Sequence, residues 1–326
     1  MWGSGFILIL EKKINRPRTG FGPGTPHRDT QKAMRIFSGF FVFAVKKACF
    51  IFFVFGLWPA GLWAQEDRVL FLPSEAVFDR LIGDPREPQN YLAAELDKDR
   101  FDGSIAATLE FLQWIQKNNT RWGWGIEGDT FIQVESPGYG QYSLTDSNYY
   151  LVLPERVSDW YLGTYLSESS GDFSNRLEFL HVSSQLGDGF FKTIQGFPYT
   201  QESFRFTASY QPSDRFRLYA GVGCYTQTVP EVAPFFAHAG VELYSSYFNL
   251  ILGTMGRGYF TYDLQASQDL GGVLNQNFAV GFQWRWKKET HQAIRFALLY
   301  YNGNSAYGQF YQQNDDHWTL GLFFDP

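Results

Sequence analysis

His181 and Ser183 are the residues whose types and spacing could carry out chemistry, in the stretch LEFLHVSSQLGDG of residues 177–189. A neutral imidazole beside a hydroxyl can act as the general base that activates a serine for acyl transfer. The alternative is a histidine of an aromatic girdle that stands next to a serine at a loop entrance. Both interpretations stay open, and the structural one leads because short motifs often match by chance.

The segment that must position this pair has the two-residue alternation of a β-strand. Arg176 and Glu178 share one face of it. Leu177, His181 and Ser183 share the opposite face. Charged side chains belong in the interior of a membrane barrel, so His181 and Ser183 are expected to point outward, near the extracellular end of the strand.

The same alternation recurs along the chain after residue 64. In residues 122–126, for example, Trp122, Trp124 and Ile126 alternate with two glycines. A soluble sandwich would also alternate. The segments are often ten or more residues long, however, whereas soluble strands average about five or six. Their apolar face is rich in aromatic residues, which make up 19% of the chain, and the other face carries Gly, Arg, Glu and Gln. These features favour an outer-membrane barrel.

Twelve such segments are expected, an even number as in bacterial single-chain barrels. We therefore predict an all-β, antiparallel transmembrane β-barrel of about 12 strands with a short N-terminal segment. The segments are 104–115, 122–135, 146–153, 158–167, 175–184, 202–211, 214–227, 234–244, 257–267, 276–287, 292–301 and 316–325.

The connections between these segments predict which end of the barrel faces which compartment. With both termini periplasmic, the turns QPSD (211–214) and KKET (287–290) fall on the periplasmic side and are short. The fifth and sixth segments, and the eleventh and twelfth, are joined on the outside by long connections. Short turns inside and long loops outside are typical of outer-membrane barrels.

The first 64 residues differ from the rest of the chain. Residues 1–33 form a Pro/Gly/Arg-rich stretch that is a non-native upstream extension in our interpretation. Residues 34–64 have the basic, apolar and small-residue regions of a secretory signal peptide, with Met34 as the true start. A permanent membrane anchor is the alternative, but the apolar run is short for one. Residues 65–103 are then a periplasmic or lumen-plugging segment, and residues 104–326 form the barrel.

The charge balance indicates which partners to expect. Nine of the 27 Lys and Arg residues and two of the 33 Asp and Glu residues precede Gln65, so the remaining chain carries 18 basic and 31 acidic residues, a net charge of −13. This argues against nucleic acid as a partner. The expected partners are outer-membrane lipid, lipopolysaccharide and, during insertion, the barrel-assembly machinery. Cys224 is the only cysteine after the signal, which excludes an intramolecular disulfide.

Charged residues on the inward faces could line a pore. A twelve-stranded lumen is intermediate between small barrels filled by side chains and large open ones. Pairing of opposite charges would occlude it, so the sequence leaves the pore open as an alternative. The residues concerned are Arg176, Glu178, Arg205, Arg217, Glu242, Arg285 and Arg295.

Residues 123–128 read GWGIEG, which matches the G-x-G-x-x-G pattern of dinucleotide sites. Such a site needs the glycines between a strand and the start of a helix. Here they lie within an alternating strand with no helix after it, and we expect them to relieve crowding on the lumen face.

Asp315, Asp316 and His317 could bind a cation, because carboxylate oxygens suit calcium. They stand in an acidic loop beside the last strand, where solvated charge is the simpler interpretation. No cofactor is expected, with calcium as the one alternative.

The pair His181 and Ser183 resembles outer-membrane phospholipase A and the lipid A deacylases, which carry His-x-Ser on an outward strand face. In those enzymes a residue that orients the histidine follows about a dozen positions after the serine. Gln195 stands at that distance here, and Asp188 is the nearer acid. The resemblance implies Ser183 as nucleophile, His181 as base, and Asp188 or Gln195 as the orienting residue. Ser184 departs from the asparagine of those enzymes.

A broader resemblance covers most of the chain after the signal. It is carried, in this order, by IGDPREPQ (82–89), LHVSSQLGDG (180–189), AGVELYSS (239–246), RFALLYYNGNSAYGQFY (295–311) and LGLFFDP (320–326). These segments resemble an outer-membrane barrel family known only as a domain of unknown function, number twelve hundred and seven in that series. The resemblance implies an outer-membrane barrel and assigns no activity.

The leading functional hypothesis is an integral protein of the bacterial outer membrane with unassigned activity, structural or transport-related. The alternative is an outer-leaflet lipid acyl hydrolase that uses the Ser/His pair on the barrel exterior.

Overall fold

The computed structural model describes residues 67–135, 155–187, 195–250, 253–268, 273–286 and 292–325. The upstream extension, the signal peptide, the expected segment 146–153 and Asp188 lie outside these ranges. In the described part of the chain no helix is long and apolar enough to cross a membrane.

The described residues form β-strands and one short 3-10 helix. The strands are β1 (Arg68–Phe71), β2 (Asn90–Glu95), β3 (Arg100–Ile115), β4 (Arg121–Glu135), β5 (Glu155–Ser170), β6 (Phe173–Leu186), β7 (Tyr199–Ser213), β8 (Phe216–Val229), β9 (Phe235–Tyr244), β10 (Phe248–Asn249), β11 (Met255–Ser267), β12 (Leu274–Arg285), β13 (Ala293–Asn302) and β14 (His317–Asp325). The helix η3 (Gly308–Phe310) precedes β14.

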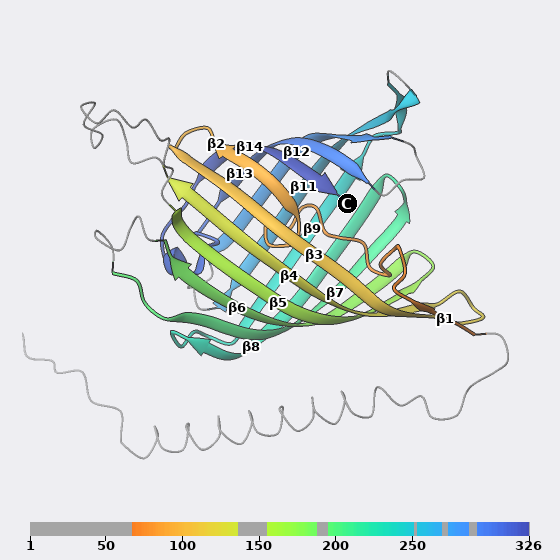
Figure 1. The fold of residues 1–326 in the computed structure, drawn as a ribbon, viewed down its shortest axis with the longest axis horizontal. Coiled ribbons are helices and arrows are strands. Elements are labelled where there is room, and N and C mark those ends of the chain that lie inside the picture. The colour runs from red at the N-terminus through yellow and green to blue at the C-terminus, as the bar shows by residue number, and fades with distance from the viewer. Residues whose placement is uncertain are drawn as a thin grey trace, which may run out of the picture. The chain divides into compact units, whose positions relative to one another are not determined.

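Twelve of these strands close into an antiparallel barrel (Figure 1). Each strand from β3 to β8 pairs with the next one along the chain, and the ring continues from β9 through β11, β12 and β13 to β14. It closes because β14 pairs with β2, and β2 pairs with β3. The short strands β1 and β10 pair with β3 and β11 outside this ring. The all-β, twelve-stranded antiparallel barrel is therefore confirmed.

The first strand of the ring is not where the alternation placed it. β2 lies at residues 90–95, inside the range 65–103 that we assigned to the segment before the barrel, and β3 begins at Arg100 rather than at residue 104. β2 has six residues, two of them alanine, so its alternation is too brief to stand out. The barrel therefore begins at Asn90, and the count of twelve is reached without segment 146–153.

Apolar side chains point out of the ring and charged side chains point into it. Trp160 and Leu162 of β5 are 53% and 63% exposed. Arg217 of β8 and Arg295 of β13, in contrast, are 2% and 1% exposed. Soluble proteins show the reverse distribution, and this one is the pattern of outer-membrane barrels.

The glycines of the GWGIEG stretch lie within β4, as predicted. A Cβ atom on Gly123 would stand 2.5 Å from the Glu110 carboxylate. A Cβ atom on Gly125 would stand 2.5 Å from the Tyr165 hydroxyl and from the Leu109 carbonyl oxygen. Gly123 and Gly125 make room for bulky inward side chains of β3 and β5, which confirms the interpretation as relief of crowding for these two. It does not hold for Gly128, whose Cβ atom would meet nothing closer than 3.7 Å.

The two ends of the barrel differ in the length of their connections. A two-residue turn at Gly171 joins β5 to β6, and residues 214–215 join β7 to β8. At the other end, residues 187–198 separate β6 from β7, and residues 303–316 separate β13 from β14. The predicted asymmetry is confirmed, and the C-terminal strand ends on the short-turn side.

Candidate functional site

The first strand of the barrel is interrupted, and the interruption enters the lumen. β4 occupies one edge of β3 along its whole length, so β1 and β2 both pair with the opposite edge. Residues 72–89, which we call the strap, connect β1 to β2. Instead of continuing the wall they cross the inside of the ring (Figure 1). Leu81, Asp84 and Glu87 of the strap are at most 1% exposed.

An apolar contact anchors the first part of the strap. Phe78 and Leu81 pack against Tyr219 of β8 in a buried cluster. The guanidinium group of Arg217 lies 4.9 Å from the centre of the Phe78 ring and donates hydrogen bonds to the carbonyl oxygens of Arg80 and Asp79, each at 2.8 Å. The strap backbone thereby supplements the acidic partner of Arg217, Glu242, which lies 3.8 Å away.

The turn at the tip of the strap is held by its main chain. The Glu242 carboxylate of β9 accepts hydrogen bonds from the amides of Ile82 at 2.7 Å and Gly83 at 3.3 Å. Asn277 of β12 donates to the Gly83 carbonyl oxygen at 2.8 Å. A Cβ atom on Gly83 would lie 2.9 Å from the Tyr219 hydroxyl, so a glycine is needed for the strap to approach the wall.

Ion pairs fix the second part of the strap to β6 and β7. Arg176 donates two hydrogen bonds to the Glu87 carboxylate, at 2.8 and 2.7 Å. Arg205 donates to Asp84 at 3.0 Å and to Glu178 at 2.6 and 3.1 Å. These two arginines and Glu178 point into the lumen as predicted. Their partners Asp84 and Glu87 come from the strap, which the alternation of the barrel strands does not reveal.

Arg86 of the strap is held among aromatic rings rather than by a close carboxylate. Its guanidinium carbon lies 4.5 Å from the centre of the Phe131 ring and 4.3 Å from that of Tyr307, positions that favour cation–π attraction. The nearest acid, Asp159, is 3.5 Å away. Tyr307 lies in the 303–316 connection, so this connection and the strap meet within the ring.

The remaining predicted lumen charges fall into two groups. Arg217, Glu242 and Arg295 are buried, and Arg295 joins the strap to the chain end by donating hydrogen bonds to Gln89 and to Asp325, each at 2.7 Å. Arg285 instead lies 5.7 Å from the Tyr247 ring at the short-turn end. The strap and its partners therefore lie inside the ring, where opposite charges are paired.

His181 and Ser183 point out of β6, as the alternation predicts. The His181 side chain is 46% exposed, and its Nδ1 atom lies 3.9 Å from a carboxylate oxygen of Glu202 on β7. Among the hydrogen bonds of the described residues none joins His181 to Ser183. Gln195 is exposed on the connection to β7. Glu202 is directly opposite His181 in the strand pairing, a register that the sequence does not reveal.

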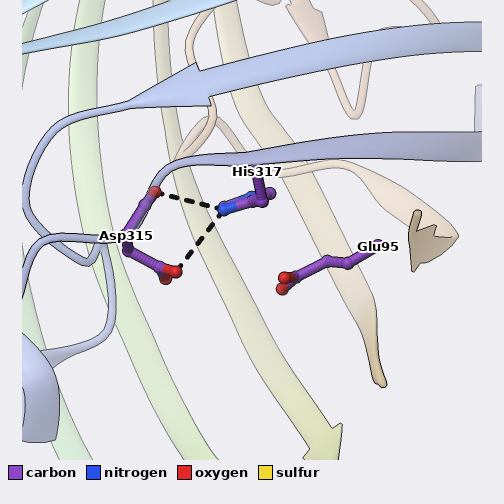
Figure 2. A group of neighbouring side chains, drawn as sticks. All are labelled: Glu95, Asp315 and His317. Atoms are coloured by element: carbon purple, nitrogen blue, oxygen red, sulfur yellow. Dashed lines mark hydrogen bonds and ion pairs between the residues drawn. The ribbon is translucent and has the colours of Figure 1, made fainter. Parts of the chain in front are cut away.

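Asp315 and His317 of the candidate cation site lie beside Glu95 of β2 (Figure 2). Asp315 already forms ion pairs with Lys98 and Arg100, both at 2.6 Å. Arg100 also contacts Glu95 at 2.5 Å. The carboxylates are thus neutralised by two cationic side chains, and a metal ion would have to displace them.

A family model described as "Protein of unknown function (DUF1207)" matches residues 63–325. The chain belongs to this family. The match takes in the strap together with the whole barrel of this DUF1207 protein. No curated protein matches it.

Several solved structures are similar to the DUF1207 protein. The KdgM porin is 8% identical, the similarity covers 73% of this chain and 98% of the porin, and the TM-score is 0.41. The beta domain of the Bordetella autotransporter BrkA is 10% identical over 73% and 98% of the two chains, with a TM-score of 0.40. OmpT of Vibrio cholerae is 10% identical over 73% and 96%, with a TM-score of 0.31.

Proposed function

We propose that this DUF1207 protein is an integral barrel of the bacterial outer membrane that is closed at rest by its own strap, and that it opens for transport only when the strap moves. The observation that carries this proposal is the seating of the strap, whose acids Asp84 and Glu87 meet Arg205 and Arg176 inside the ring. An open porin would instead leave these arginines facing water.

The outer surface supports the proposed location. Side chains such as Ile105 at 75% exposure, Val222 at 63% and Phe296 at 53% form an apolar exterior that would be costly to expose to water. Outer-membrane lipid and lipopolysaccharide are the expected surroundings of this surface. Insertion would then require the barrel-assembly machinery.

Ion conductance in planar bilayers tests the closed state. The wild-type protein should conduct rarely or not at all. Urea, at a concentration that leaves the barrel folded, should release the strap and produce reversible channel openings. Glu87→Gln, which removes one charge but keeps the side-chain shape, should lower the urea concentration that is needed.

Two results would contradict the proposal. Steady conductance of the wild-type protein without urea would mean that the strap does not close the lumen. Absence of conductance in urea, when protease accessibility shows that the strap has been released, would mean that the lumen has no conducting state.

A second candidate function is the outer-leaflet lipid acyl hydrolase, favoured by one specific observation. A carboxylate oxygen of Glu202 lies 3.9 Å from Nδ1 of His181. A histidine that acts as a general base through Nε2 needs a partner near Nδ1 that orients its ring. Ser183 lies two residues along the same face and borders a surface depression that is also lined by Phe197 and Thr200. Glu202 would therefore be the residue that orients His181, in place of Asp188 or Gln195, to which the resemblance assigned this role.

Acyl release from phospholipid and lipopolysaccharide tests this second candidate. Release should disappear in Ser183→Ala and fall strongly in His181→Ala and Glu202→Gln. Asn175→Ala, on the same outward face of β6 but away from this depression, is the matched control and should keep full activity. Absence of release from the wild-type protein on both substrates would leave His181 and Ser183 as outward polar residues without catalytic function.

A further inference from the structure

A cavity of about 190 Å³ lies in the lumen above the tip of the strap. Asp84 and Arg86 of the strap are among its lining residues, and its walls come from β5 to β9, β11, β12 and the 303–316 connection. All of these strands are at their long-loop ends here, so the cavity is on the side opposite to the short turns. We call it the vestibule.

Aromatic rings form much of the vestibule wall. Tyr199 of β7 and Tyr311 of the 303–316 connection lie with ring centres 5.7 Å apart. Tyr225 of β8 and Phe236 of β9 form a second pair at 4.8 Å. Tyr161 of β5 also lines the cavity. Flat aromatic faces of this kind pack against rigid rings that carry C–H groups.

The polar groups between the rings are mainly uncharged hydrogen-bonding groups. Gln201, Gln265 and Asn275 line the vestibule, and each amide can donate and accept. Gln265 uses its amide nitrogen on Asp84 at 3.0 Å, which leaves its oxygen available. No hydrogen bond of the Gln201 amide is found among the described residues.

His238 adds a further polar group to the vestibule wall. Its side chain is 4% exposed and lines the vestibule. Nε2 is hydrogen-bonded to Thr207 at 3.0 Å, and Nδ1 lies 3.8 Å from the Asp84 carboxylate, beyond hydrogen-bond distance, with no hydrogen-bond partner in the described part of the chain. Buried polar atoms are rarely left in this condition. A ligand hydroxyl beside Nδ1 and Asp84 would complete this hydrogen bonding.

The charges of the vestibule are already compensated. Asp84 is paired with Arg205 at 3.0 Å, and Arg86 is covered by aromatic rings with Asp159 close by. Neither an anionic nor a cationic ligand would find an unpaired opposite charge, and either would lose its hydration on entry. The site therefore suits an uncharged ligand with many hydroxyl groups.

We propose that the vestibule binds a neutral saccharide of one or two rings, which stacks on the tyrosines and hydrogen-bonds to Gln201 and His238. The cavity volume is below the range typical of drug-sized ligands, which limits the ligand to this size. Such a saccharide has two possible sources, a free sugar and the sugar chain of lipopolysaccharide. The proposal does not depend on movement of the strap.

Calorimetric titration of the full-length barrel, refolded in an amine-oxide detergent that contains no sugar, tests this site. The probes are maltose, cellobiose, a neutral hexose disaccharide from the outer part of the lipopolysaccharide core, and digalacturonate as the charged counterpart. At least one neutral probe should bind, and digalacturonate should bind at least about tenfold more weakly because of its uncompensated charge. Binding of maltose or cellobiose indicates a free sugar, and binding of the core disaccharide alone indicates lipopolysaccharide.

Two variants locate the binding in the vestibule. Tyr225→Ala removes a stacking face and should weaken the affinity about three- to tenfold. Gln201→Ala removes only an amide and tests the same site with little risk to folding. Tyr210→Ala, on the outer surface of β7, is the matched control and should bind like the wild type. Absence of heat with all neutral probes, equal affinity in both vestibule variants, or a preference for digalacturonate would overturn the proposal.

Discussion

The Glu87 carboxylate and the Arg176 guanidinium group face each other in a two-point ion pair, with oxygen–nitrogen distances of 2.8 and 2.7 Å. Their side chains are 1% and 5% exposed. A buried pair of this kind costs much of its attraction in lost hydration. Arg176 also lies 3.1 Å from Glu178, and Glu87 lies 3.7 Å from Arg205, so the pair belongs to a buried charge network. The strap and the barrel wall are therefore joined by several coupled ion pairs.

Glu87→Ala should lower the free energy of unfolding by about 1–3 kcal/mol, because Arg176 would lose its strap partner inside the ring but would keep Glu178 at 3.1 Å. Urea unfolding in lipid vesicles measures this change. Asp79→Ala is the control, because Arg217 contacts the backbone carbonyl oxygen of Asp79 and the substitution changes only the side chain. Equal stability of the Glu87 and Asp79 variants would mean that the ion pair does not hold the strap.

Gly125→Ala should destabilise the barrel by about 1–3 kcal/mol, as overpacking does. The added Cβ atom would lie 2.5 Å from the Leu109 carbonyl oxygen, and a backbone atom cannot turn aside as a flexible side chain can. Gly128→Ala on the same strand is the matched control, because its Cβ atom would meet nothing closer than 3.7 Å. The same urea titration compares the two, and a larger loss for Gly128→Ala would refute the account of crowding.

The connection before β14 should show a defined pH dependence through Asp315. Burial opposes ionisation of this carboxyl, but hydrogen bonds from His317, Arg100 and Lys98 outweigh it and hold the pKa of Asp315 well below its usual range. The usual pKa of an aspartate is about 3.9. Ionised Asp315 therefore stabilises the fold above about pH 4, and this contribution is lost as the pH falls through the lower, folded-state pKa.

Unfolding of the wild type and of Asp315→Asn, compared from pH 7 downward, checks this expectation. The difference in stability should stay constant down to about pH 4 and shrink only below it. A difference that vanishes between pH 7 and pH 5 would show that Asp315 titrates near or above its usual value. The ion pairs would then not dominate its environment.

Calcium should leave the stability of the wild-type protein unchanged, because Lys98 and Arg100 already neutralise the carboxylates of Asp315 and Glu95. Thermal unfolding with added calcium and with a chelator measures this. Arg100→Gln removes the cationic partner of Glu95 and leaves Asp315 with Lys98, and this variant should become stabilised by calcium. A calcium-dependent shift in the wild type would instead reveal a resident cation site.

The barrel strands could be predicted because each long strand repeats its alternation many times. The expected segment 257–267 differs from β11 only at its first two residues. β2 was missed because six residues with small side chains carry little pattern.

The inward direction of Arg176 could also be predicted, but not its partner. Glu87 is 89 residues away, on a segment without any periodicity. Glu202 was missed for a related reason, since its approach to His181 depends on the pairing register of β6 and β7. Alternation identifies the face of a side chain, and only the register identifies its neighbour.

The interrupted first strand has a consequence for how the protein is made. β2 follows the strap directly in the chain, and it must pair with β14, the last strand, before the ring is complete. A strap left outside until that moment would then have to thread through a finished wall. We therefore expect the strap to be enclosed during biogenesis while the seam between the first and last strands is still open, so that each molecule would leave assembly with its strap already inside.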